Sequence, residues 1–173
     1  MAKKAAPKQK TLNDLFLDTV KDIYYAEKQV LRILPKMARN AESDDLRKVF
    51  ETHKEQTQGQ IERLDHIFEL LGKRSQGKPC EAMLGIIEEC KEHMEEYDGS
   101  PALDAAILSS AQAIEHYEIT RYGTLRSWAQ KLGMDEAVKL IEETLNEEKE
   151  TDARLTEVAE SAVNAEAQQE AAE

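Results

Sequence analysis

Six side chains with metal-binding chemistry interrupt apolar stripes that repeat at helical spacing: Glu27, His53, Glu115, Glu118, Glu148 and Asp152. Each lies on or beside a position that alternating steps of four and three predict to be buried. Every stripe is apolar at both ends and polar in its middle, whereas chance would scatter such interruptions along the helices. An unpaired carboxylate in an apolar interior costs several kcal/mol, and clustered like charges raise that cost unless a proton or cation is shared. We therefore interpret these residues as candidate metal ligands.

The donor types narrow the choice of metal. Carboxylates with one imidazole suit iron or manganese better than the thiolate-rich sets that hold structural zinc. Two alternatives remain open from the residues alone. The polar layer could be neutralised by protonation or by a basic side chain such as Arg121, and then serve only to fix the register of the helices. His53 could be an ordinary hydrogen-bonded core histidine.

Four long helical patterns must position these residues, over residues 11–40, 43–72, 100–131 and 134–163. Thr11 with Asp14, and Ser43, are suitable N-terminal caps for the first two patterns. Ser100 is the expected cap of the third, with Pro101 as its first residue. The candidate ligands lie near the middle of each pattern, so they are expected at one level of a bundle.

Loop lengths predict how the helices are connected. The first two helices are joined by about three residues, as are the last two, so each pair should form an antiparallel hairpin. The middle connection has roughly 27 residues and contains a shorter helix over residues 80–97, enough to climb a long helix of about 42 Å. The sequence therefore predicts an all-α, ferritin-like four-helix bundle with one long crossover that contains a short extra helix.

Composition excludes several classes of protein. The 173 residues include 35 Asp and Glu against 23 Lys and Arg, with 7 glycines and 4 prolines. Few turn residues disfavour a many-stranded sandwich or barrel, and a net charge of −12 disfavours a dedicated nucleic-acid binder. The sequence contains no run of 18 apolar residues, so it predicts no membrane span. Two cysteines make no disulfide framework, so we expect a cytoplasmic protein.

The ends of the chain differ from the bundle in composition. Residues 1–10 carry four lysines without apolar periodicity and are expected to form a disordered basic arm. Residues 164–173 are polar and of low complexity, so we expect a disordered tail there. The predicted folded domain spans residues 11–163. Within it, Tyr24 and Tyr122 flank the candidate ligands and could either hydrogen-bond them or simply fill the core.

Several segments together resemble one family: Asp22-Ile-Tyr-Tyr-Ala-Glu27-Lys-Gln, Cys80-Glu-Ala-Met, Glu115-His-Tyr-Glu118-Ile, Tyr122-Gly-Thr-Leu and Thr144-Leu-Asn-Glu-Glu148-Lys-Glu-Thr-Asp152. The sequence is similar over about residues 11–160 to the YciE/YciF family of bacterial stress-associated ferritin-like proteins. That resemblance implies a helical bundle, a homodimer, and a carboxylate-bridged site for two iron or manganese ions in each chain.

Ferritin-like sites use one Glu on each of two helices, and Glu27 and Glu115 match these positions. They also use Glu-x-x-His on each of the other two helices, and here the sequence departs from the pattern. The last helix offers Glu148 with Asp152 four residues on, and the second helix has His53 without a glutamate three residues before it.

Two functions follow as expectations. The first is a stress-response metalloprotein that acts on O₂ or peroxide as a ferroxidase or peroxidase, with Glu115 or Glu118 bridging the ions. The second is a non-enzymatic, dimeric helical protein that acts through protein partners, its polar layer being purely structural.

Overall fold

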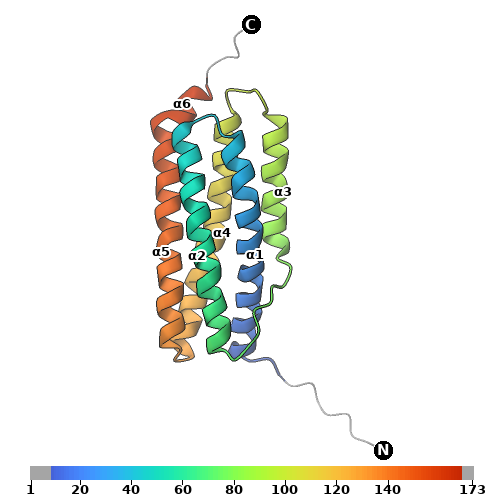
Figure 1. Ribbon diagram of the computed structural model, residues 1–173, viewed down its shortest axis with the longest axis vertical. Helices are drawn as coiled ribbons and strands as arrows, with labels where there is room; N and C mark the ends of the chain where they lie inside the picture. Colours follow the sequence, from blue (N-terminus) through green and yellow to red (C-terminus); the bar gives the residue numbers. More distant parts are fainter. Residues whose placement is uncertain (1–8, 169–173) are drawn as a thin grey trace, which may run out of the picture.

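The computed structural model describes residues 9–168 and is built from helices (Figure 1). In chain order these are α1 Leu12–Asn40, α2 Asp44–Leu70, α3 Glu81–Glu96, α4 Leu103–Lys131, α5 Asp135–Val158, the π-helical turn η1 Ala159–Val163 and α6 Asn164–Glu166. No strand occurs within residues 9–168. The all-α class is therefore confirmed, and in this range no helix is long and apolar enough to cross a membrane.

Only part of the predicted arm and tail lies within the described residues. Residues 1–8 and 169–173 lie outside the described residues. Gln9 and Lys10 precede the first helix without regular structure. Helix α6 extends helical structure to residues 164–166, three residues into the segment that was expected to be disordered.

Local sequence signals explain most helix ends. Thr11 and Asp14 form a capping box, in which the Thr11 side chain accepts from the Asp14 N–H and the Asp14 carboxylate accepts from the Thr11 N–H. Ser43 caps α2 by accepting from the Leu46 N–H. Gly72 follows α2 with φ of 61°, a left-handed conformation that glycine adopts without strain.

The predicted start of α4 was wrong by two to three residues. The helix begins at Leu103 after Ala102, and no side chain caps it. Tight turns occupy the preceding residues, because the Ser100 N–H donates to Tyr97 O and the Leu103 N–H donates to Ser100 O. The Ser100 hydroxyl is used within this turn, where it accepts from the Ala102 N–H.

Helices α1 and α2 form one antiparallel hairpin and α4 and α5 the other, with α2 packed on α5 and α1 on α4 (Figure 1). The crossover runs up the outside of α1, where the Lys78 N–H donates to Lys21 O at 3.0 Å. Gly77 allows this close approach, since a Cβ there would lie 3.1 Å from the Tyr25 Cβ. Helix α3 then packs on α1 and α4. The one-crossover ferritin-like topology is confirmed.

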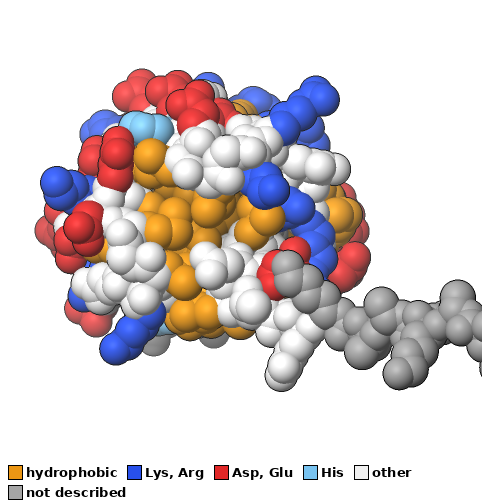
Figure 2. Space-filling model, turned by 90° about the horizontal axis from the view of Figure 1, so that it is seen from below, with side chains coloured by type: hydrophobic (Ala, Val, Ile, Leu, Met, Phe, Trp, Pro, Cys, Tyr) orange, Lys and Arg blue, Asp and Glu red, His pale blue; other side chains and the backbone are white. Residues whose placement is uncertain are grey.

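The bundle core is apolar toward both ends and polar in its middle. Phe16, Val20 and Ile23 fill one end of α1's buried face, and Leu34 and Met37 fill the other. Burying side chains of this size contributes about 1.5–3 kcal/mol each. Figure 2 shows the end at which α1 starts and α2 finishes, with hydrophobic side chains gathered near its centre. Leu15 in the first turn of α1 and Leu70 at the end of α2 are 48% and 40% exposed.

Candidate metal centre

Four of the six predicted ligands converge inside the bundle. His53 on α2, Glu115 and Glu118 on α4, and Glu148 on α5 each offer one donor atom, and these atoms all lie within 4.8 Å of one another. All four residues are buried. Donors bound about 2.0–2.2 Å from one ion lie up to about 4.4 Å apart, so this spacing needs little contraction to surround a cation. The buried cluster could therefore hold a metal ion.

Helical geometry accounts for the convergence. Glu115 and Glu118 are three residues apart on α4, so they project from the same face. His53 and Glu148 lie on the facing sides of α2 and α5, the two helices that pack beside each other. Each residue lies near the middle of its helix, which brings all four to one level of the bundle.

Glu27 adds a carboxylate from α1. It is fully buried, and its Oε1 accepts a hydrogen bond from the Tyr122 hydroxyl while its Oε2 lacks a hydrogen-bond partner. Burial is the largest cause that raises the pKa values of Glu27 and Glu118. The negative charge of Glu148 raises the pKa of Glu27 further, and the charge of Glu27 does the same to Glu118. Glu27 therefore belongs to the same electrostatic cluster, which all four long helices supply.

Eight buried side-chain atoms lack a hydrogen-bond partner among the described residues: Glu27 Oε2, His53 Nε2, Gln60 Oε1, Glu115 Oε2, both Glu118 oxygens and both Glu148 oxygens. A buried polar atom without a partner costs about 1–3 kcal/mol, so native proteins contain few of them. Seven of these eight belong to the His53, Glu27, Glu115, Glu118 and Glu148 cluster, and all are lone-pair donors. A cation among them would satisfy atoms that the protein itself leaves unpaired, so the residues present fit a metal.

Burial dominates the electrostatics of the cluster. It is the largest cause that raises the pKa values of Glu27, Glu115 and Glu118 well above 4.5, and neighbouring carboxylates raise them further. Without a cation these groups therefore hold protons more tightly than exposed glutamates do. A bound cation would compete with those protons and favour the carboxylate form.

The two arginines nearest this cluster, Arg121 and Arg63, are bonded to groups outside it. Arg121 donates to the Tyr117 hydroxyl at 3.0 Å and lies 4.0 Å from Asp22, on the side of α4 that faces the crossover. Arg63 lowers the pKa of Glu27, but its guanidinium is bonded to Glu147 and, at 2.9 Å, to Thr144.

His53 is oriented by residues behind it. Its Nε2 lies 3.1 Å from Glu115 Oε1 and 3.8 Å from Glu148 Oε2, and the shorter contact lacks hydrogen-bond alignment. On the other side of the ring, Nδ1 lies 3.4 Å from Thr151 Oγ1, which donates to Gln56 Oε1 at 3.4 Å. With that donation made, Thr151 can accept from Nδ1–H, which leaves the Nε2 lone pair toward the carboxylates. This is the tautomer that a metal requires.

The structure does not bring Asp152 to the cluster. Its side chain is 24% exposed and accepts from His116 Nε2 at 3.1 Å and Gln112 Nε2 at 3.3 Å. The reason is helical rotation: three residues after Glu148 the buried position is Thr151, and Asp152 lies one step farther around α5. Residues that sequence reasoning did not assign to the site are Gln56, Gln60 and Thr151, although Gln60 and Thr151 already fell on the predicted buried stripes.

A four-helix bundle with one crossover and a central layer of carboxylates and histidine defines a ferritin-like protein. Comparison with known proteins agrees with this class. The family model described as "Domain of unknown function (DUF892)" matches residues 11–168. Protein YciF of Escherichia coli strain K12 is 44% identical over 163 residues, covering 94% of this chain and 98% of that protein.

Two solved structures are similar over most of their length. The crystal structure of the E. coli stress protein YciF has a TM-score of 0.85 and 44% identity, covering 90% of this chain and 99% of that chain. YcfI from Rhodopseudomonas palustris, described as a proposed structural protein, has a TM-score of 0.84 and 46% identity, covering 87% and 96%. The chain belongs to the YciE/YciF family.

Proposed function

We propose that this chain is a bacterial stress-response metalloprotein that binds iron or manganese in the centre of its bundle. The observation that carries the proposal is the concentration of unpaired, buried lone-pair atoms at the level of His53 and Glu115. The stress role is supported by the similarity to the E. coli stress protein YciF. Free cysteines at positions 80 and 90 support a cytoplasmic location.

His53, Glu115, Glu118 and Glu148 would hold one ion. Glu27, whose Oε2 lacks a hydrogen-bond partner, would extend the donor set toward a second ion. Carboxylate oxygens with one imidazole suit Fe(II) and Mn(II). When bound, such an ion pair would supply redox chemistry toward O₂ or peroxide.

The protein's own residues would prepare the site for that chemistry. Tyr122 holds Glu27 by donating to its Oε1, and Thr151 fixes the His53 ring through Nδ1. All five ligand side chains are at most 2% exposed, so bulk water is excluded from the layer. A dry, rigid donor set of this kind strengthens electrostatic interactions with a cation.

Metal content tests the proposal directly. The protein is expressed in medium supplemented with iron and manganese, and bound metal is measured by plasma mass spectrometry. Glu115→Gln should lose the metal because a neutral amide replaces a central carboxylate. Asp152→Asn is the matched control on the edge of the bundle and should retain it. Less than a tenth of an equivalent in the unmodified protein would contradict the proposal.

Redox activity is a separate measurement on the same material. Fe(II) is added anaerobically, then O₂ or peroxide, and near-ultraviolet absorbance follows the formation of Fe(III). We expect oxidation faster than that of free Fe(II) in the unmodified protein and the free-iron rate in Glu115→Gln. Equal rates in both proteins would restrict the function to metal binding.

The departure from Glu-x-x-His on two helices favours a second candidate, a non-enzymatic, homodimeric helical protein that acts through partners. Raised carboxyl pKa values support it, because protonated side chains would form a neutral polar layer without metal. Under this candidate neither the dimer mass in light scattering nor the melting temperature would depend on the metal supplied, in the unmodified protein or in Glu115→Gln.

A further inference from the structure

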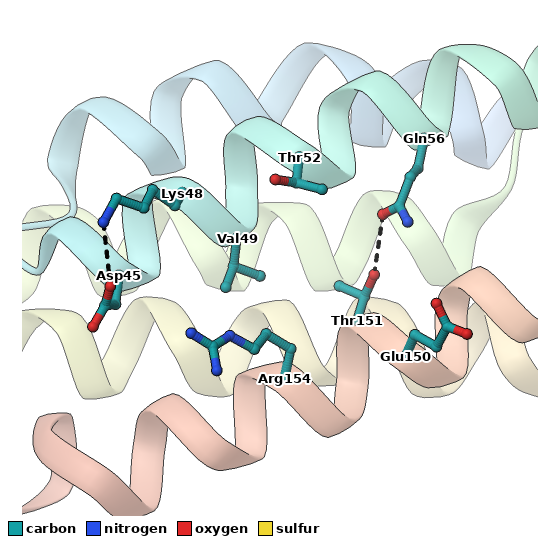
Figure 3. A pocket seen from close by; sticks show the side chains of 8 residues that line it. All are labelled: Asp45, Lys48, Val49, Thr52, Gln56, Glu150, Thr151 and Arg154. Atoms are coloured by element: carbon teal, nitrogen blue, oxygen red, sulfur yellow. Dashed lines mark hydrogen bonds and ion pairs between the residues drawn. The ribbon is translucent and has the colours of Figure 1, made fainter.

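A surface groove lies directly behind the candidate metal centre, between α2 and α5 (Figure 3). It encloses about 300 Å³. Asp45, Lys48, Val49 and Thr52 line it from α2, and Glu150 and Arg154 from α5. Its remaining two lining residues, Gln56 and Thr151, are also the residues that lead to His53.

The floor of the groove is a thin polar partition. Gln56 and Thr151 point toward each other across it (Figure 3), with Thr151 Oγ1 donating to Gln56 Oε1 at 3.4 Å. Thr151 Oγ1 is in turn 3.4 Å from His53 Nδ1. One layer of side chain therefore separates the groove from a residue of the buried cluster, whose imidazole is only 2% exposed.

We propose that this groove is the entrance through which a divalent cation reaches the metal centre, with Gln56 and Thr151 as its gate. The inference rests on the proposed metal-binding function. It adds a route, and a pair of residues that control it, to a site whose ligands are buried between the four helices.

Charge in the groove suits a hydrated cation. Lys48 is paired with Asp45 at 3.4 Å, and Arg154 with Glu157, so both basic side chains are compensated. Glu150 adds a carboxylate near the floor (Figure 3). The gate itself offers neutral oxygen donors, an amide and a hydroxyl, which can replace waters of hydration one at a time.

The gate can open without moving the backbone. Hydrogen bonds of 3.4 Å between an amide and a hydroxyl are long and therefore weak. Gln56 is half-buried and has groove space beside it, so a change of its side-chain rotamer can uncover Thr151. Side-chain rotations of the buried Thr151 and His53 must follow before a cation can reach the Nε2 side of the ring.

A second groove of about 320 Å³, between α1 and α2, provides a contrast. Its buried lining includes the apolar Leu34 and Phe50, which are 2% and 1% exposed. Arg39, Arg47 and Lys54 line it with one acidic residue, Glu51. Arg47 is paired with Asp44, which leaves two basic side chains against one acidic side chain, so the charge of this groove opposes a cation. It is a matched control of similar size.

The test fills each groove and follows cobalt(II) binding to the whole metal-free chain by stopped-flow absorbance. Thr52→Trp fills the α2–α5 groove from an exposed position, and Lys54→Trp does the same in the control groove. Removing the Lys54 charge would, if anything, speed the approach of a cation. Thr52→Phe is a second filling variant, also without charge, in case the tryptophan impairs folding.

A blocked route changes rates but not equilibrium. Thr52→Trp should slow association and dissociation of cobalt by the same factor, about tenfold, which corresponds to a barrier about 1.4 kcal/mol higher. The dissociation constant should stay unchanged, because the plug touches neither bound nor free cobalt. Lys54→Trp should leave both rates as they are.

Three results would overturn the inference. Unchanged rates in both Thr52 variants, with cobalt bound at equilibrium, would do so while leaving the proposed function intact. Slower association with unchanged dissociation would mean a damaged centre rather than a blocked route. No cobalt bound to the unmodified protein would overturn the route and the metal-binding function together.

Discussion

Replacing Glu118 by Gln tests whether the buried layer is held together by protons when metal is absent. Glu118 is fully buried, both of its carboxylate oxygens lack hydrogen-bond partners, and burial raises its pKa well above 4.5. The folded chain therefore keeps this proton after the unfolded chain has lost it. Stability that depends on the protonated group is complete below pH 4.5 and is lost as the pH rises toward the folded-state pKa.

The expected size follows from proton linkage. Each proton that the folded state retains lowers the free energy of unfolding by about 1.4 kcal/mol per pH unit. Between pH 5 and 7, one such carboxyl costs the metal-free protein up to about 2.7 kcal/mol. Glu118→Gln removes this titration, and it also removes one like charge from Glu115, whose pKa Glu118 raises. The variant should therefore gain stability over the unmodified protein as the pH rises.

Urea unfolding of chelator-treated protein at pH 5, 6 and 7 measures the effect. The unmodified protein should lose stability with pH more steeply than Glu118→Gln, and the exposed control Glu160→Gln should follow the unmodified protein. Manganese(II) should stabilise the unmodified protein more than it stabilises Glu118→Gln. For the unmodified protein the effect should be largest at pH 7, because fewer protons compete with the ion there than at pH 5 or 6. Parallel pH slopes for Glu118→Gln and the unmodified protein would refute the linkage argument.

Three further substitutions test the structure: two change residues around the centre, and one removes a distant contact. Tyr122→Phe leaves Glu27 Oε1 without its donor, so we expect a loss of about 1–3 kcal/mol in urea unfolding of the metal-free protein; an unchanged midpoint would show that this bond carries no stability. Thr151→Val removes the acceptor of His53 Nδ1 and should weaken cobalt(II) affinity by about 10–100-fold, whereas Thr151→Ser should restore it. Asp104→Ala removes the carboxylate that accepts from the Glu42 and Ser43 N–H groups at 2.8 and 2.6 Å, and should cost about 1.5–3 kcal/mol in thermal unfolding without altering metal content.

The fold was predictable because its determinants are local. Thr11 and Ser43 occupy the caps expected of them, and Gly72 ends α2 with a positive φ. Helix length and loop length then leave few ways to connect the bundle. The start of α4 was not predictable, because the turns over residues 97–103 depend on hydrogen bonds between backbone groups rather than on a side-chain cap.

The sequence predicts at which level of the bundle the site lies, but not which side chains from different helices contact one another there. The position of a carboxylate along a helix follows from the sequence, so Glu27, His53, Glu115, Glu118 and Glu148 could be placed together. How far each helix is rotated about its axis follows from packing with its neighbours. That rotation decides that Arg63 on α2 meets Glu147 on α5. Pairs of this kind lie more than 80 residues apart in the chain, beyond any local pattern.

The departure from Glu-x-x-His on α5 and the groove share one residue, Thr151. On α5 the residue three positions after Glu148 is Thr151, and on α2 the residue three positions after His53 is Gln56. Both are neutral and bonded to each other instead of extending into the cluster, and together they form the floor of the α2–α5 groove. A side chain bound to the metal from either position would fix that residue in place and close the route. Under the proposed function, this site has fewer ligands than the full ferritin-like pattern and has a gate beside the one histidine of the cluster, which favours faster exchange of metal at lower affinity.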